Sequence, residues 1–429
     1  MTELILEEKG HAGITGAQLA KAIKQSVAGC QGLKRVLLVV PDYTRYHSNA
    51  GNIANLYYHF LEPGCHVNLL VALGTHAAMT PDECRHMYGD IPFDRFIMHN
   101  WRKDTVHLGT VPGKFVAKVS GNLLDTSIDV EVSRHVMQGE YDLVLSVGQV
   151  VPHEIVGMAN QSKNIFVGCG GFSIINLSHM LGAFYGMERI MGRDKTPVRQ
   201  VFDYAQEHFL KKVPLCYVLT VTTAPGGNIC THGLYIGRGR KYFEAAVAKA
   251  QQTNMILVDK PLKKVVVYLN ETEFRSTWIG NKSIYRTRMA IADGGELIVL
   301  APGVEKFGED AEIDPLIRKY GYCGREKVLQ LVEENADLRD SLSAAAHLIH
   351  GSSDGRFSIT YCTQHLTKQE VERALFGYLP YQQAARMYNP QKLLDGFNTL
   401  PNGDEIYYIS KPSLGLWASK DKFEGERGM

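Results

Sequence analysis

Short apolar runs that alternate with helical patterns fill the first half of the chain, and this alternation limits the fold more than any other feature. Each run is short and is bounded by turn residues, as expected for a buried strand. Because helical patterns lie between the early runs, the sequence predicts βαβ units around a mainly parallel sheet. The expected strands are 36–41, 67–73, 141–147, 164–168 and 215–221.

Two of the helical patterns begin with a capping signal. Thr15 and Gln18 have the spacing of a capping box at the start of the expected helix 17–27. Thr80 and Glu83 have the same spacing, and a proline between them suits the first helical turn. Both helices are therefore expected to begin at these threonines.

The length of 429 residues is too great for one ordinary core and predicts two domains. The pattern pauses at 259–261 and restarts with an expected strand at 263–269. We expect a two-domain α/β protein in which each domain has a mainly parallel sheet flanked by helices. The expected parts are an N-terminal domain 1–258, a smaller C-terminal domain 263–400, and a segment 401–429 that could pack back on the N-terminal domain.

The second half offers further expected elements. They are helices at 284–292, 326–334, 342–350 and 368–375, and a strand at 296–301 that follows a turn at 293–295.

Charge and cysteine content exclude several classes of protein. Lysine and arginine total 46 and the acidic residues 45, so no global field would attract nucleic acid or an anionic membrane. The first ten residues lack the basic start of a secretory signal, and no apolar run approaches the roughly 20 residues of a membrane span. Eight scattered cysteines without a CxxC pair favour reduced thiols in the cytoplasm.

Polar side chains follow three of the expected strands. Asp42 and Arg45 come after the first, His76 after the second and His153 after the third. Ligands of open α/β sheets gather at the carboxyl ends of strands, where an arginine can grip a carboxylate and two histidines can serve as general acid and base. A polar cleft at this edge is therefore expected.

Simpler interpretations compete with that one. Asp42 and Arg45 also fit an ordinary turn with a local ion pair, and a single histidine is more often structural than catalytic. Taken alone, Lys163 is typical of a solvated surface lysine, and His179 of a core or interface histidine. Walker A, G-x-G-x-x-G, G-x-S-x-G and H-E-x-x-H motifs do not occur. The residues by themselves do not define a reaction.

Several segments together resemble the nickel-dependent lactate racemase family. In 151–163, His153 is followed by Gly157 and, ten residues after the histidine, by Lys163, which is similar to the family's PH-x3-G and lysine. His179 lies sixteen residues beyond Lys163, as the metal-binding histidine does in the family. The segments 41–45 and 72–83 resemble the family's D-x-T-R turn and A-T-G-x-H element.

The resemblance implies a cofactor that the residues alone could not suggest. It is a nickel-pincer nucleotide, a pyridinium bis-thio acid mononucleotide joined covalently to Lys163, with nickel bound by His179. His76 and His153 become the catalytic acid/base pair, and Arg45 a substrate-binding residue.

The remaining implied roles and partners are these. Asp42 and Thr44 would contact the cofactor, and Lys282 the substrate. The site would lie in an interdomain cleft that the C-terminal domain closes. Cofactor maturation enzymes are implied partners, and a homo-oligomer is compatible with the sequence.

Two departures bear on the substrate. Where the family reads G-x-S-G-G-x-K, this chain has Asn160 and Gln161 at the two adjacent glycines, so the loop is expected to differ in detail. Where the family has a glutamine three residues before the lysine, this chain has Ile279 before Lys282. We therefore expect a racemase or epimerase of a longer or sugar-derived 2-hydroxy acid rather than of lactate.

Two other functions stay open at this stage. A noncatalytic hydroxy acid- or nucleotide-binding protein would explain the altered loop. An ordinary nicotinamide oxidoreductase would need the dinucleotide fingerprint that the chain lacks.

Overall fold

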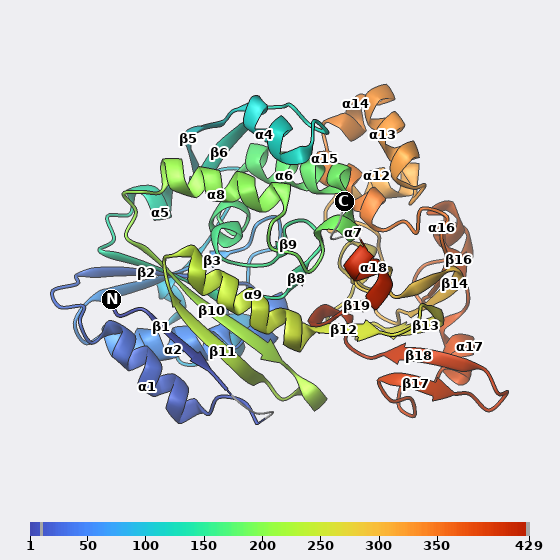
Figure 1. Cartoon of the computed structure of the whole chain (residues 1–429), viewed down its shortest axis with the longest axis horizontal. Helices are drawn as coiled ribbons and strands as arrows, with labels where there is room; N and C mark the ends of the chain where they lie inside the picture. The colour runs from blue at the N-terminus through green and yellow to red at the C-terminus, as the bar shows by residue number, and fades with distance from the viewer. Residues whose placement is uncertain (9–11, 426–429) are drawn as a thin grey trace. The chain divides into compact units, whose positions relative to one another are not determined.

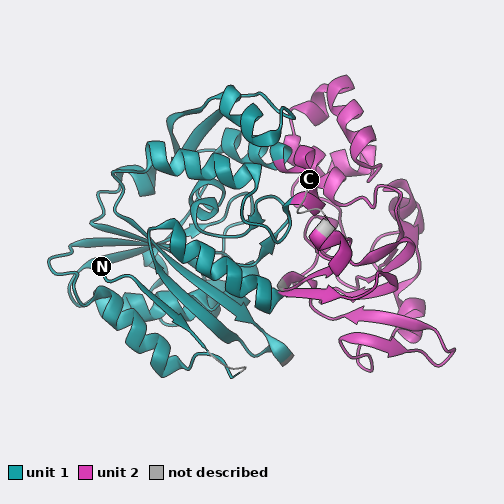
Figure 2. Cartoon of the chain, in the orientation of Figure 1, with its two compact units in different colours: residues 1–181, 190–254 teal, residues 182–189, 255–429 magenta. Residues whose placement is uncertain are grey.

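The computed structural model describes residues 1–8 and 12–425 and divides into two compact units (Figure 2). Unit 1 contains residues 1–181 and 190–254, and unit 2 contains residues 182–189 and 255–429. The sequence placed the boundary a few residues later, at 259–262. It also gave no sign that the short segment 182–189 groups with the second half of the chain.

Unit 1 is built on a seven-stranded, mainly parallel sheet, as expected (Figure 1). Strands β10, β7, β2, β3 and β4 are parallel, and β11 and β1 complete one edge in antiparallel pairing. In spatial order the strands are β1 (Leu4–Glu7), β11 (Cys230–Gly237), β10 (Leu215–Thr223), β7 (Leu143–Gln149), β2 (Arg35–Pro41), β3 (His66–Ala72) and β4 (Phe96–Met98).

Two short antiparallel pairs and a set of helices complete unit 1. The pairs are β5 (Thr105–Val111) with β6 (Ile128–Ser133), and β8 (Pro152–His153) with β9 (Gly157–Met158). The α-helices are α1 (Gly16–Val27), α2 (Ala50–Leu61), α3 (Pro81–Tyr88), α4 (Gly113–Ser120), α5 (Arg134–Gln138), α8 (Pro197–Phe209) and α9 (Arg240–Asn254). Shorter turns are η1 (Tyr43–Ser48), η2 (Phe93–Arg95) and η4 (Pro225–Gly227), while α6 (Phe172–Tyr185) and α7 (Met187–Ile190) include the residues at which the units divide.

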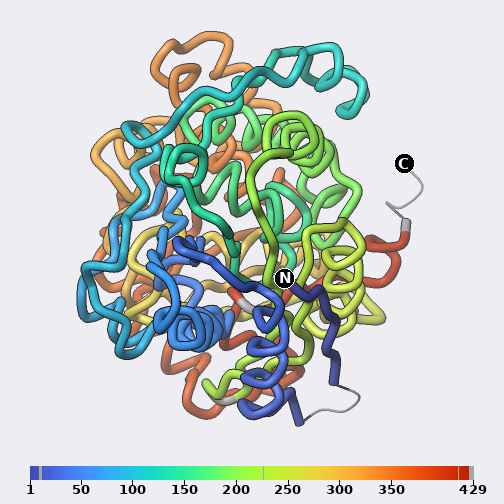
Figure 3. Tube along the Cα trace, turned by 90° about the vertical axis from the view of Figure 1, so that its left-hand side faces the viewer, coloured from blue at the N-terminus to red at the C-terminus, as the bar shows by residue number. Residues whose placement is uncertain are grey.

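The central strand β2 explains why helices cover both faces of this sheet. Its residues are apolar at every position from 36 to 40 and all are buried. Leu37 and Val39 pack in one core with α8 and α9, whereas Leu38 and Val40 pack in another with α1 and α2. Figures 1 and 3 show these helix pairs on opposite sides of the strands. A continuous apolar run of this kind is typical of a parallel sheet buried on both faces.

Both predicted capping boxes are confirmed. Thr15 and Gln18 exchange backbone and side-chain hydrogen bonds at the start of α1. Thr80 and Glu83 do the same at the start of α3, with the proline at the first helical position. Each box pairs two backbone N–H groups that the helix leaves without partners.

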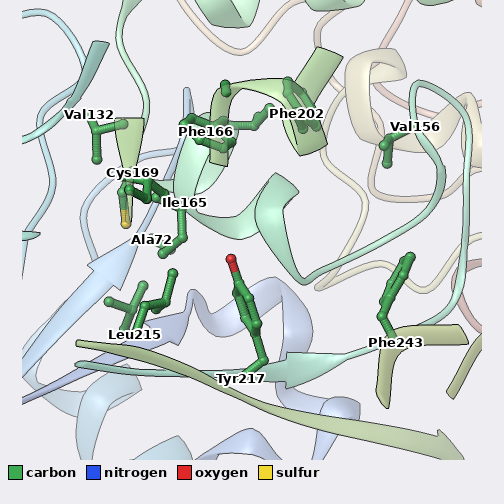
Figure 4. Close-up of a cluster of buried hydrophobic side chains, with 14 of the residues drawn as sticks. Ala72, Val132, Val156, Ile165, Phe166, Cys169, Phe202, Leu215, Tyr217 and Phe243 are labelled. Carbon is green, nitrogen blue, oxygen red and sulfur yellow. The ribbon is translucent and has the colours of Figure 1, made fainter. Parts of the chain in front are cut away.

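The expected strand 164–168 is wrong. These residues form a π-helix, η3 (Asn164–Gly168), in which the N–H of Cys169 donates to the carbonyl of Asn164 at 3.0 Å. A short run that is apolar on every side has no period that separates a strand from a buried helical turn. Figure 4 shows Ile165 and Phe166 inside the core of unit 1, where Phe166 stacks on Phe202 at 5.9 Å.

Unit 2 has its own mainly parallel sheet. In spatial order its strands are β16 (Gly377–Tyr378), β15 (Ser358–Cys362), β14 (Ile291–Leu300), β13 (Leu262–Tyr268), β18 (Glu405–Ile409) and the antiparallel β17 (Gly396–Thr399). A separate parallel pair joins β12 (Met255–Val258) and β19 (Leu416–Ser419). The helices are α10 (Thr277–Gly280), α11 (Lys282–Tyr285), α12 (Ile313–Tyr320), α13 (Arg325–Glu334), α14 (Ala336–Arg339), α15 (Leu342–His350), α16 (Lys368–Arg373), α17 (Tyr381–Met387) and α18 (Lys420–Gly425), with the turn η5 (Pro412–Leu414).

Most of the expected elements of unit 2 occur, but the helix 284–292 is wrong. The helical turn α11 ends at Tyr285, and β14 already begins at Ile291, which pairs with Leu262. The expected turn falls inside β14, where Gly294 has φ +75°. In the segment 401–429, of which 426–429 lie outside the described residues, β18 and β19 pair with strands of unit 2.

No helix within residues 1–8 and 12–425 is long and apolar enough to cross a membrane.

We predict that Phe166→Ala lowers the free energy of unfolding of unit 1 by about 3–5 kcal/mol, because the ring is fully buried and its removal leaves a cavity. Urea unfolding followed by circular dichroism measures the loss. Phe60→Ala is the control, since Phe60 is 36% exposed. Equal losses in the two variants would contradict the packing described for η3.

Candidate functional site

The strand order of unit 1 reverses between β2 and β7. From β2 the chain moves outward through β3 and β4, and later strands are added on the opposite side as β7 and β10. Ligands of open α/β sheets bind outside the carboxyl ends of strands at such a switch point. Asp42 follows β2, and His153 follows β7 in the short strand β8. The predicted residues therefore start from the two strands that flank the switch point.

Asp42 and His76 form a direct pair at this edge. Oδ2 of Asp42 lies 3.0 Å from Nδ1 of His76, and Oδ1 accepts from the backbone N–H and hydroxyl of Thr44 at 2.8 and 2.5 Å. The carboxylate is buried, which alone would raise its pKa. The charges of His76 and Arg45 and the bonds from His76 and Thr44 outweigh burial and hold the pKa of Asp42 well below its ordinary value. Asp42 is thus a fixed anion that orients His76.

The loop that carries His76 is tied to the π-helix. The N–H of Gly74 donates to the carbonyl of Gly168 at 2.9 Å, and Gly74 has φ +56°. A side chain at Gly74 would be strained in this left-handed conformation. The loop after β3 and the segment after Lys163 therefore hold each other in place.

His153 lies in the hairpin formed by β8 and β9 and is buried. Its Nδ1 accepts a hydrogen bond from the backbone N–H of Ile155 at 3.1 Å. Oε2 of Glu154 lies 3.7 Å from the same ring nitrogen. The backbone of the hairpin thus positions this ring, whereas a carboxylate positions His76.

Lys163 immediately precedes the π-helix and is partly buried. Burial, together with the positive charges of Arg45 and Arg199, lowers its pKa to about 8, although Glu154 and Asp42 act in the opposite direction. A substantial fraction of the amine is therefore neutral near physiological pH. A neutral amine is the nucleophilic form of a lysine side chain.

The loop before Lys163 contains two consecutive non-glycine residues in the left-handed backbone conformation. Asn160 has φ +68° and Gln161 has φ +56°, both in the left-handed region that glycine prefers. These residues stand where the family pattern has its two adjacent glycines. The segment therefore has a backbone that glycine favours, although neither residue 160 nor residue 161 is a glycine.

Arg199, near the start of α8, holds this loop. Its fully buried guanidinium donates to the carbonyls of Met158 and Asn160 at 2.6 and 3.2 Å and to the hydroxyl of Ser162 at 2.8 Å. Burial lowers the pKa of Arg199 to about 10, so the group stays charged at neutral pH. The sequence alone did not predict this role of Arg199, because nothing near it indicates a contact about forty residues away.

His179 lies in α6 with Nδ1 2.6 Å from the carbonyl oxygen of Ile175. Since a carbonyl only accepts, Nδ1 carries the proton and Nε2 has a lone pair. Burial and the positive charge of Lys163 lower the pKa of His179 to about 4, although the Ile175 carbonyl and Glu154 oppose them. A neutral imidazole whose second nitrogen is fixed by a carbonyl is the usual form of a metal ligand.

Several of the predicted residues of unit 1 lie close enough to shift one another's pKa. The charges of Asp42 and Arg45 shift the pKa of Lys163, and the charge of Lys163 lowers the pKa of His179. Glu154, which was not among the predicted site residues, raises the pKa of both Lys163 and His179. Its position next to His153 was the one available signal.

Lys282 belongs to unit 2, where it begins α11 and lies 5.8 Å from the centre of the Phe274 ring. Its expected contact with a substrate stays a prediction. Within residues 1–8 and 12–425, no group of three or more histidine, cysteine or acidic side chains could hold a metal ion by itself.

The fold and the strand-end side chains define unit 1 as a doubly wound α/β domain with a polar, partly cationic site at its switch point. Residues 14–190 match the family model described as the lactate racemase N-terminal domain. This part of the chain is therefore similar to the N-terminal domain of lactate racemases.

Solved structures give the same fold. A protein from Thermotoga maritima, solved as a structural-genomics target, is 22% identical with a TM-score of 0.83, over 97% of this chain and 100% of its own. The lactate racemase apoprotein from Thermoanaerobacterium thermosaccharolyticum is 15% identical with a TM-score of 0.67, over 93% and 92% of the two chains. No curated protein matches the sequence.

We predict that the amine of Lys163 titrates with a pKa of about 8 in the apoprotein. The rate of acetylation at each lysine, followed by peptide mass spectrometry across a pH series, measures it. Lys319 is the internal control, since the Asp337 carboxylate raises its pKa. Arg45→Met should raise the pKa of Lys163 by removing a nearby positive charge. A Lys163 that titrates together with Lys319 would contradict the assignment.

We predict that Arg199→Met lowers the free energy of unfolding by about 3–5 kcal/mol, since it leaves buried carbonyls of the loop without their charged donor. Arg85→Met is the control, because Arg85 forms an exposed pair with Asp82. Urea unfolding measures both, and hydrogen exchange should show faster exchange at 158–162. Equal stability of the two variants would refute the role of Arg199.

Proposed function

We propose that this protein is a racemase or epimerase that inverts C2 of a 2-hydroxy acid through a 2-keto acid intermediate. The proposal is supported by the charges of Asp42, which contacts His76, and of Glu154, which follows His153, because both shift the pKa of Lys163. Lys163 in turn lowers the pKa of His179, and residues 14–190 match the lactate racemase N-terminal domain. A structure solved at 15% identity supports the fold alone, so the reaction itself is our inference.

The residues fit a nickel-pincer nucleotide. Lys163 has the partly neutral amine that a thioamide linkage requires, and His179 has a neutral ring whose Nε2 lone pair could bind nickel. Lys163 would hold the nucleotide covalently, His179 would ligate the metal, and Asp42 and Thr44 would contact the nucleotide from the turn after β2. When bound, this group would accept a hydride from C2 of the substrate and return it.

The side chains of the protein would handle the proton and the carboxylate. A ring nitrogen of His76 or His153 would take the proton of the 2-hydroxyl as the C–H bond breaks, and a proton would return to the oxygen when C2 is rebuilt. Arg45 would bind the substrate carboxylate, because a guanidinium matches its two oxygens. Lys282 would add a further substrate contact.

The side chains around Arg45 favour a substrate longer than lactate. Tyr46 stacks on His86 with ring centres 4.9 Å apart, and the hydroxyl of Tyr43 lies 2.7 Å from Nδ1 of His86. This partly exposed aromatic group offers both a flat face and polar atoms next to Asp42 and Arg45. A sugar-derived hydroxy acid, with a chain of hydroxyls and C–H groups, fits such a surface. We further propose a cytoplasmic location, where maturation enzymes could install the cofactor.

We predict that protein co-expressed with cofactor maturation enzymes carries a nucleotide adduct on Lys163, contains about one nickel per chain, and epimerises at least one sugar-derived 2-hydroxy acid. Intact mass, metal analysis and chiral chromatography across a panel of 2-hydroxy acids measure these three results. Lys163→Ala should lose all three, because it removes the attachment point.

Lys195→Ala is the matched control, since Lys195 is exposed and should keep the adduct, the nickel and the activity. An active, nickel-loaded Lys163→Ala protein would refute the proposal. Wild-type protein with neither adduct nor epimerisation would favour the noncatalytic binding function instead.

A further inference from the structure

Ser162, the residue before Lys163, is fully buried between a cation and an anion that both come from α8. Its hydroxyl oxygen accepts a hydrogen bond from the guanidinium of Arg199 at 2.8 Å and donates one to Oδ1 of Asp203 at 3.4 Å. Arg199 and Asp203 are four residues apart and therefore lie on the same face of the helix. The side chain next to Lys163 is thus held by two charged groups of one helix.

The proton of the Ser162 hydroxyl has two acceptors at the same distance. Oε1 of Gln161 and Oδ1 of Asp203 both lie 3.4 Å from the hydroxyl oxygen. The Gln161 oxygen already accepts from Arg199 at 3.3 Å. A hydrogen bond to an ionised carboxylate is also stronger than one to an amide oxygen. Asp203 is therefore the favoured acceptor.

The carboxylate of Asp203 also joins this loop to a second helix. Its Oδ2 pairs with the guanidinium of Arg240, the first residue of α9, and Arg240 pairs in turn with Oδ1 of Asp194 at 2.5 Å. Each oxygen of Asp203 thus has its own partner, one in the loop and one in α9. Because Arg199 is a fully buried cation, the nearby carboxylate also offsets part of the cost of its burial.

We infer that Asp203 is a positioning residue for Lys163, which acts through Ser162 and is itself fixed by Arg240. This inference rests on the proposed function, in which Lys163 must present its amine to the cofactor. Two consecutive residues of the loop are in the left-handed conformation, which persists only where other contacts hold it. Arg199 binds carbonyls of that part of the loop, and Asp203 binds the hydroxyl that follows it.

The protonation of Lys163 reports on its placement. Burial is the largest cause that lowers the pKa of this amine to about 8. A looser loop would let water reach the amine and return its pKa toward the ordinary value of a lysine. Loss of the Asp203 charge by itself would act in the opposite direction, because a nearby carboxylate favours the charged amine. The sign of the change therefore separates positioning from a purely electrostatic effect.

The direct test is the pH dependence of Lys163 acetylation in the apoprotein, followed by peptide mass spectrometry with Lys319 as the internal reference. We expect Asp203→Ala to raise the midpoint at Lys163 by about one pH unit. Hydrogen exchange at 158–162 should become faster in the same variant. An unchanged or lower midpoint in Asp203→Ala would overturn the inference.

Asp194→Ala is the matched control. It also removes a carboxylate from Arg240, but it leaves the acceptor of Ser162 in place. We expect no rise of the Lys163 midpoint in this variant. A rise equal to that of Asp203→Ala would show that any loss of charge beside Arg240 has the same effect, and would overturn the inference.

A double-variant cycle tests whether Ser162 carries the effect. Ser162→Ala should also raise the midpoint, and adding Asp203→Ala to it should cause little further change. Additive shifts would contradict the route through Ser162. If Asp203→Ala does not fold, Asp203→Leu takes its place in the cycle, because it removes the same carboxylate, nearly keeps the volume of the side chain and suits a helix. It should give the same rise.

These measurements separate the inference from the proposed function. Acetylation and hydrogen exchange need neither cofactor nor substrate, so a raised midpoint in a protein without epimerase activity would contradict only the proposed reaction. In protein co-expressed with maturation enzymes, Asp203→Ala should carry several-fold less nucleotide adduct on Lys163 than Asp194→Ala. Equal amounts of adduct in the two variants would contradict the role of Asp203 in presenting Lys163.

Discussion

A buried carboxylate at the end of the central strand organises this molecule's candidate site. Removing a carboxylate from water costs several kcal/mol unless charges and hydrogen bonds replace the water. Asp42 receives two bonds from Thr44 in its own turn and one from His76 on the loop of the neighbouring strand. The compensation is complete only if β2 and β3 are adjacent and both loops have their observed conformation. The ionised form of Asp42 therefore fixes two strand-end loops at once.

The segment before Lys163 depends on a similar compensation. Two consecutive non-glycine residues in the left-handed region cost roughly 1–2 kcal/mol each. Such a conformation persists only where the surroundings hold it. Here the guanidinium of Arg199 binds the Met158 carbonyl before the left-handed pair, the Asn160 carbonyl within it and the Ser162 hydroxyl after it. Because Lys163 follows directly, the strain and its compensation determine where the amine lies. The hydrogen bonds of Arg199 thus hold the loop that positions Lys163.

The sequence predicted those features of the fold that depend on residues close together in the chain. The capping boxes at Thr15 and Thr80 were found because their partners are three residues apart, and strands such as β2 because a buried parallel strand is apolar throughout. The same signal failed at 164–168, where an equally apolar run closes a π-helix. At the site, Lys163 and His179 were predicted from the family spacing, and the other residues also from their places after expected strands, but their partners were not predicted. The hydrogen bond between Asp42 and His76 depends on the order of the strands in the sheet. The hydrogen bonds from Arg199 to the loop before Lys163 depend on how α8 packs.

The charges around Lys163 explain why these partners matter together. Arg45 and Arg199 both lower the pKa of Lys163, and Lys163 in turn lowers that of His179. Several cationic groups can share such a partly buried space only if some are neutral or if anions lie among them, and both conditions hold here. Asp42 and Glu154 supply negative charge, while Lys163 and His179 give up protons more readily than usual. The result is a site in which a guanidinium lies near an amine and an imidazole that have free electron pairs. Those are the forms that covalent attachment and metal ligation require.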